Sequence, residues 1–244
     1  MPPSTKQEDT RDVATEYDLP VPLTGLPTPS TGPYKDNTNL YAAGDVVVWV
    51  GQPNNASPPT GFEDPTTLGS GIYKCLGWAD VAGYIFKLDE TIKDIPAAGI
   101  LTPVRSILTG GVKTVQAVFL EALNPYVRSL YDDVPVFPVA SSPLKPTTSG
   151  VTGGSVNSST YIIPDPPADN RYALIFDSID GVKRQRLYAP FAKVTARGND
   201  QAQQGDIVMT DLTFTFYPGT IGTATNAVAQ RSVDYGKPMT AYFT

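Results

Sequence analysis

The stretch GYIFKLDETIKDIPAAGILTPVRSILTGGVKTVQAVFLEALNPYVRSLYDD, residues 83–133, decides the fold class of this chain. Its apolar residues recur first with the two-residue period of strands and then with the spacing of a short helix. Gly110-Gly111 lies between two strand-like runs and is a typical hairpin signal. The stretch gathers no catalytic residue types, so it indicates a protein built by pairing strands. We expect a polar loop over residues 89–94 and strands over residues 84–88, 104–109 and 113–121.

The period changes at Asn124, which is a favoured N-cap and precedes Pro125, a residue suited to the first position of a helix. Three large side chains then follow at helical spacing: Val127, Leu130 and Tyr131. The sequence therefore predicts a short helix that ends near Asp133. The adjacent carboxylates Asp132 and Asp133 are expected to be solvated at its end, because neighbours in sequence point apart.

The flanking sequence continues the strand pattern. Asp180-Gly181 joins two strand-like runs as a second hairpin signal. The 24 prolines and 21 glycines argue against long helices and for many turns. The expected fold class is mainly β: a β-sandwich or partly closed barrel with one short flanking helix and long loops. Further strands are expected over residues 45–50, 72–78, 171–179, 182–188 and 207–217.

Polar and proline-rich segments divide the chain. Residues 1–40 read as an extended N-terminal arm, and residues 41–244 as one β domain with a long loop at 51–71 and an insertion at 138–159. The N-terminal arm carries a short apolar segment that lies along a neighbouring chain if the arm is ordered, and the alternative is a disordered tail. That segment contains Leu19, Val21 and Leu23.

Composition limits the chemistry. The chain has 244 residues, no histidine, one cysteine and a formal net charge of −6. The commonest general base and metal ligand is therefore missing, and a negative surface disfavours nucleic-acid binding. We expect no enzyme activity, no metal, no cofactor and no membrane span, and a buried, inert thiol at Cys75.

Several other side chains have competing interpretations. The cluster Lys183-Arg184-Gln185-Arg186 contacts phosphate, pairs with acidic groups of a neighbouring subunit, or lies in solvent. Trp49 and Trp78 lie in or beside apolar strands, so core positions are expected for both.

Two blocks, residues 77–131 and 173–218, resemble the major tail protein, or tail-tube subunit, of long non-contractile-tailed phages, in particular those of actinobacterial hosts. The first block carries Gly77-Trp78, Gly83-Tyr84, Asp89-Glu90, Lys93-Asp94-Ile95, Pro103-Val104-Arg105, Asn124-Pro125 and Leu130-Tyr131. The second block carries the Asp180-Gly181 hairpin, the run Ala189-Pro190-Phe191-Ala192-Lys193-Val194 and the closing residues 212–218.

The resemblance implies a virion protein, assembled in the host cytoplasm. Hexameric rings stack into a hollow tube that conducts genomic DNA without binding it specifically. The implied partners are further copies, the tape measure, the tail terminator and the distal tail protein. The expected inner-sheet or lumen residues are Asp89, Glu90, Asp94, Arg105, Lys113 and Gln116. The expected inter-subunit or inter-ring residues are Leu19, Val21, Leu23, Phe62, Glu63, Asp64, Arg184 and Arg186.

Two alternatives stay open. One is a soluble β-sandwich binding module, such as an adhesin or glycan-binding domain, which would use exposed Tyr and Trp residues. The other is a different tail component, such as a tail terminator or distal tail protein; a tube rather than one closed ring would separate the tail-tube subunit from the terminator.

Overall fold

A computed structural model describes residues 41–53, 58–68, 73–96, 102, 104–135, 137, 161–165, 169–200 and 206–235. The N-terminal arm with Leu19, Val21 and Leu23, and the insertion at 138–159, lie outside these residues. The described part contains one helix, α1 (Pro125–Asp132), and nine strands. The strands are β1 (Asp45–Gly51), β2 (Lys74–Ile95), β3 (Arg105–Phe119), β4 (Tyr172–Asp180), β5 (Lys183–Arg197), β6 (Thr210–Tyr217), β7 (Gly219–Ile221), β8 (Ala224–Ala227) and β9 (Gln230–Asp234).

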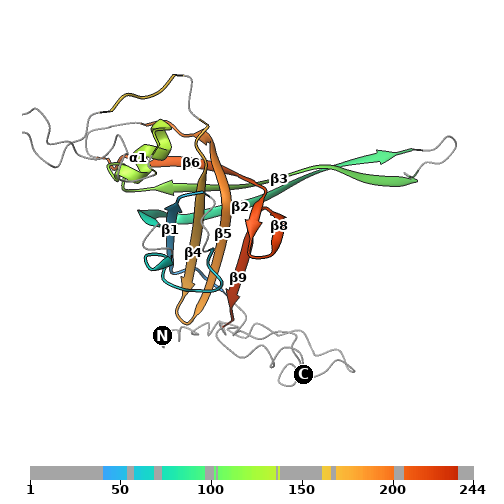
Figure 1. Ribbon diagram of the computed structural model, residues 1–244, viewed down its shortest axis with the longest axis horizontal. Coiled ribbons are helices and arrows are strands. Elements are labelled where there is room, and N and C mark those ends of the chain that lie inside the picture. Colours follow the sequence, from blue (N-terminus) through green and yellow to red (C-terminus); the bar gives the residue numbers. More distant parts are fainter. Residues whose placement is uncertain are drawn as a thin grey trace, which may run out of the picture. The chain divides into compact units, whose positions relative to one another are not determined.

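Seven strands form one antiparallel sheet in the order β4-β1-β2-β3-β6-β5-β9 (Figure 1). The long strand β5 also pairs with β4, so the sheet partly closes on itself. β7 and β8 make a separate small hairpin. The predicted mainly β, sandwich-like fold with one short helix is confirmed.

The core lies between the facing parts of this folded sheet. Phe176 of β4 is fully buried at its centre, with its ring centroid 5.2 Å from that of Tyr84 and 6.2 Å from that of Phe214. β6 alternates as predicted: its inward side chains are buried and the intervening ones are partly exposed. The inward residues of β6 are Leu212, Phe214 and Phe216.

The helix begins and ends where the sequence predicts. Asn124 caps it by accepting a hydrogen bond from the backbone N–H of Tyr126 at 3.0 Å. Asp133 ends it in the left-handed region, with φ of 57°. The expectation that Asp132 and Asp133 are solvated is wrong, because both are buried against the sheet.

The prediction of a hairpin turn at Gly110-Gly111 is also wrong. Both glycines lie inside β3, and residues 89–94, expected to be a loop, continue β2 to Ile95. β2 and β3 therefore form one long strand pair, in which Thr91 lies opposite Gly110 and Glu90 opposite Gly111. The Asp180-Gly181 hairpin is confirmed: Gly181 has φ of 58°, in the left-handed region that favours glycine.

Candidate functional site, an exposed hairpin and a clamped loop

The outer half of the β2–β3 strand pair extends beyond the other strands (Figure 1). We call residues 85–95 of β2 and 105–113 of β3 the distal hairpin. Within the described residues, residues 85–95 pair only with β3 and residues 105–113 only with β2, since β1 pairs with residues 74–78 of β2 and β6 with residues 114–119 of β3. Both outer edges of the distal hairpin thus expose unpaired backbone groups, which are ready to pair with another chain.

The distal hairpin carries large aliphatic side chains on both faces. Cross-strand partners share a face and successive residues alternate. The face that continues the core residues Tyr84 and Phe86 has Leu88, Ile92 and Leu108. The opposite face has Ile85, Ile95, Ile107 and Val112. All seven are between 36% and 60% exposed.

This arrangement costs stability in a lone chain. An isolated two-stranded hairpin is marginal in water, and exposed apolar surface of this kind marks an interaction site. Completing the burial of one aliphatic side chain that is half exposed contributes roughly 1 kcal/mol. The distal hairpin is therefore the candidate interaction surface of the described chain.

The six predicted lumen residues do not share one face. Register places Glu90, Asp94 and Lys113 on the face that has Leu88. Asp89, Arg105 and Gln116 lie on the opposite face. Asp94 accepts a hydrogen bond from the Ser106 hydroxyl at 2.5 Å, and the Gln116 amide donates to Asp211 at 2.9 Å. A single carboxylate-lined wall that includes both Asp89 and Glu90 is not formed by this chain, because adjacent strand residues point to opposite sides.

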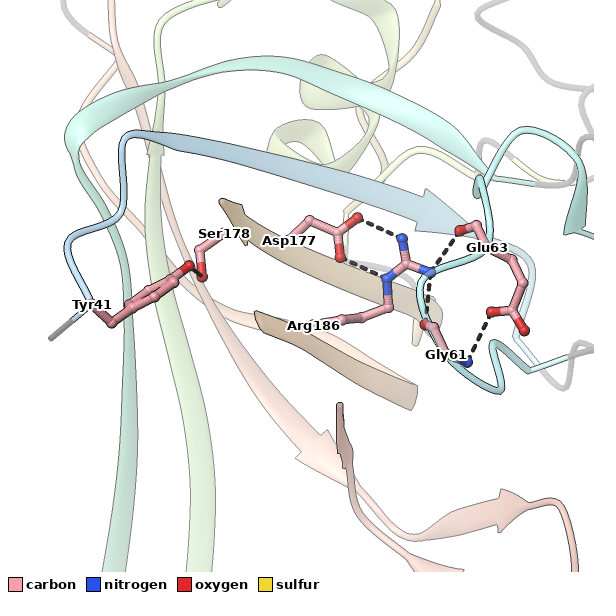
Figure 2. A network of polar contacts seen from close by, with 6 residues as sticks. All are labelled: Tyr41, Gly61, Glu63, Asp177, Ser178 and Arg186. Atoms are coloured by element: carbon pink, nitrogen blue, oxygen red, sulfur yellow. Dashed lines mark hydrogen bonds and ion pairs between the residues drawn. The ribbon is translucent and has the colours of Figure 1, made fainter. Parts of the chain in front are cut away.

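Arg186, predicted to contact another subunit, is used within the chain instead (Figure 2). Its side chain is buried and makes a bidentate pair with Asp177 of β4: Nε donates to Oδ1 at 2.6 Å and Nη2 to Oδ2 at 2.8 Å. Nη1 donates to the carbonyls of Gly61 at 3.1 Å and Glu63 at 2.7 Å. Its guanidinium carbon also lies 5.8 Å from the ring centre of Phe62. Arg186 thus clamps the loop 60–64 onto the β4–β5 hairpin. Arg184, its neighbour on the same predicted cluster, remains exposed.

The Asp177–Arg186 pair could have been found from the sequence. A hairpin at Asp180-Gly181 pairs Asp180 with Lys183, and the same register places Asp177 opposite Arg186. The contacts of Arg186 with Gly61 and Glu63 had no such signal, because more than a hundred residues separate the partners.

The clamped loop holds its two carboxylates by local hydrogen bonds. Thr60 donates to Glu63, and this bond is the main reason that the pKa of Glu63 is lowered. The backbone N–H of Thr66 donates to Asp64 at 2.8 Å and lowers the pKa of Asp64. Glu63 and Asp64 are exposed, as an inter-subunit role requires, and that role stays a prediction.

The two tryptophans differ. Trp49 is partly buried and packs against a small second cluster that includes Tyr73 and Tyr188. Trp78 is 72% exposed, so its expected core position is wrong. Cys75, expected to be buried, is only half-buried, and its sulfur accepts a hydrogen bond from the backbone N–H of Gly77 at 3.3 Å.

A buried polar cluster lies at the end of α1. Tyr161 donates to Asp132 at 2.7 Å, and Asn170 donates to the side chain of Asp133 at 3.2 Å. Arg197 lies 3.7 Å from Asp133 Oδ1, while Oδ2 has no hydrogen-bond partner in the described structure. Burial is the main cause of the raised pKa of Asp133. Because these groups already engage one another, the cluster fixes the helix end.

No known family model and no curated protein sequence matches the chain. Among the described residues, no group of three or more His, Cys, Asp or Glu side chains is placed to hold a metal ion. No helix in the described ranges is long and apolar enough to cross a membrane.

Proposed function

We propose that this chain is a structural subunit that assembles with copies of itself, as the tail-tube protein of a long non-contractile-tailed phage. Hexameric rings stack into a hollow tube through which genomic DNA passes. The observation that carries the proposal is the distal hairpin, with its seven exposed aliphatic side chains and two open strand edges. A surface of this kind is stable when another chain covers it.

Two further features support assembly of identical copies. A ring needs a heterologous contact, in which one surface of each copy meets a different surface of the next, and a hairpin that extends from a sheet-built body supplies one half of it. The net charge of −6 suits a conduit in which DNA slides without sticking. The remaining partners follow from the family resemblance alone: the tape measure, the tail terminator and the distal tail protein.

The test is negative-stain electron microscopy of the purified chain over a range of concentrations, with sedimentation velocity on the same samples. We expect hollow tubes with a regular ring repeat. The double variant Ile92→Ser/Leu108→Ser should remain monomeric at concentrations where the wild type assembles, because these two residues lie opposite each other on one face of the hairpin. The matched control is Val182→Ser, an exposed aliphatic in the β4–β5 turn. Equal assembly by all three proteins would contradict the proposed role of the hairpin.

The exposure of Trp78 favours a second candidate, a binding module for glycans, since aromatic rings stack on sugar faces. That candidate gives the distal hairpin no role. A wild-type chain that stays monomeric at every concentration and binds in a glycan screen would establish it. A single closed ring without tubes would indicate a tail terminator.

A further inference from the structure

Outside the distal hairpin, three further exposed apolar side chains lie on two neighbouring segments, the bulged part of β2 and the turn that precedes α1, which are joined by the hydrogen bond from the Leu120 N–H to the Trp78 carbonyl. We call this group the corner, and it consists of Trp78, Val81 and Leu123. Their side chains are 72%, 98% and 93% exposed. Trp is one of the residue types enriched among the side chains that dominate binding energy at protein interfaces.

The backbone around the corner has a defined conformation. β2 pairs Ala79 with Phe119 and then Tyr84 with Ala117, so residues 80–83 form a bulge on the β2 side. Bulges of this kind redirect side chains at the edges of sheets. Gly77 has φ of 85°, and Glu121 lies so close over it that an added Cβ would be 2.3 Å from the Glu121 carboxyl carbon.

Glu121 then connects the two segments of the corner, the β2 segment with Trp78 and the turn with Leu123. Its Oε1 accepts a hydrogen bond from the backbone N–H of Trp78 at 3.1 Å. The backbone N–H of Asn124 donates to the Glu121 carbonyl at 2.9 Å, and the Asn124 amide donates to the Cys75 carbonyl at 3.4 Å. Trp78 and Leu123 are therefore exposed on a braced backbone rather than on a free loop.

We propose that the corner is the docking surface for the distal hairpin of a second copy of this chain. This inference rests on the proposed self-assembly and names the surface that receives the hairpin. A heterologous contact needs two different surfaces on each copy, one donated and one receiving. The corner supplies the apolar receiving surface, and the hairpin supplies aliphatic side chains to cover it.

Charge favours the same pairing. The distal hairpin has four cations and three carboxylates, a net charge of +1, whereas the whole chain has −6, so the rest of the chain carries −7. The cations are Lys87, Lys93, Arg105 and Lys113. The corner is flanked by Asp80 and Glu121, and no ion pair within the described residues involves either carboxylate. A weakly basic hairpin thus meets an acidic rim, and this complementarity steers association and fixes register.

Cross-linking tests the contact directly. The native cysteine is first removed by Cys75→Ser, and two proteins are made in that background, one with Leu108→Cys on the hairpin and one with Leu123→Cys on the corner. They are mixed at assembly concentration, oxidised, and run on a non-reducing gel with one partner tagged. We expect a mixed disulfide dimer that neither protein forms alone. A mixture of Leu108→Cys with Val182→Cys is the control, and a mixed dimer no more abundant than in that control overturns the proposal.

A second measurement separates the failure of this inference from the failure of the proposed function. The double variant Trp78→Ser/Leu123→Ser should raise the concentration needed for assembly roughly tenfold or more. If it assembles like the wild type while Ile92→Ser/Leu108→Ser does not, the hairpin docks elsewhere and only this inference fails. If the wild type never assembles, both fail.

Discussion

β6 and the distal hairpin both carry large apolar side chains, which are buried in β6 and exposed in the hairpin. In β6 the alternating side chains Leu212 and Phe214 are fully buried, because β3 and β5 flank the strand and the opposite part of the sheet covers it. In the distal hairpin, Ile92 and Leu108 are each 60% exposed, because in the described structure neither face has a covering layer. The sequence therefore indicates which side of a strand is apolar, one side in β6 and both sides in the distal hairpin. Whether that side is buried depends on a second layer, which for the hairpin we assign to another copy.

We call the described residues outside the distal hairpin the body. Truncation of a side chain at its centre should have the largest effect on stability. Phe176→Ala removes a fully buried ring that packs against Tyr84 and Phe214, so we expect the free energy of unfolding to fall by about 3–5 kcal/mol. Urea unfolding of dilute, monomeric protein measures it. Ile92→Ala is the matched control on the hairpin and should change stability little. Similar losses for both variants would mean that the hairpin is buried within the chain and does not differ from the body in burial.

The clamp on loop 60–64 should come next. Arg186→Met keeps the aliphatic stem but leaves the Asp177 carboxylate without its bidentate partner, so we expect a loss of about 3 kcal/mol. The exposed neighbour in Arg184→Met should cost less than about 0.5 kcal/mol. Adding Asp177→Leu to Arg186→Met should restore part of the loss, because no unpaired buried charge then remains. Equal effects of the two arginine variants in urea unfolding would argue against an intrachain clamp.

The sequence predicted the parts of this fold that local physics determines. The Asn124 cap, the alternation of β6 and the turn at Gly181 each follow from a few neighbouring residues. Gly110-Gly111 failed because two adjacent glycines have the signature of a tight turn, yet here they lie extended in β3, paired with Thr91 and Glu90. Strand continuation there is decided by pairing with a distant partner. The segment that forms β9 was missed for the same reason, since it pairs with β5. β7 and β8 form a local hairpin, and they were missed because their residues are mostly small and polar.

Burial of individual polar and aromatic side chains was the least predictable property. Trp78 follows a register shift in the pairing of β2 with β1, where Gly77 has φ of 85°, and it is exposed although Leu76, two residues before it, is fully buried. Asp133 is buried because it terminates a helix that packs on the sheet. In both cases the deciding contact joins segments that are distant in sequence. Residue type and spacing therefore predicted the wrong environment, the core for Trp78 and solvent for Asp133.

Asp133 gives a smaller, pH-dependent effect within the body. Its pKa is raised by burial, so the folded state binds its proton more tightly than the unfolded chain does. Its contribution to stability is therefore complete below the ordinary carboxyl pKa near 4 and is lost as pH rises through the raised value. Asp133→Asn removes this loss, and Asn suits the left-handed backbone at this position.

Urea unfolding at two pH values measures that effect. Relative to the wild type, Asp133→Asn should gain up to about 1 kcal/mol at pH 7.5 and little at pH 4. Asp211→Asn is a control for a carboxylate that accepts a hydrogen bond, from Gln116. A variant that is less stable than the wild type at pH 7.5 would show that the charge of Asp133, through Arg197, stabilises the helix end.

The smallest effect on the isolated chain is the sharpest test of the contrast between body and hairpin. Ile92 and Leu108 lie opposite each other, more than half exposed, so Ile92→Ser/Leu108→Ser removes little burial from the monomer. Each substitution should change the free energy of unfolding by no more than about 0.5 kcal/mol in dilute solution, while assembly is lost. Hydrogen exchange adds a second readout, because the backbone amides of the hairpin should exchange fast in the monomer and slowly in the assembly. If the free energy of unfolding of the dilute variant falls by several kcal/mol, these two side chains are covered by residues of the same chain. The hairpin would then belong to the body, and the observation that supports self-assembly would be removed.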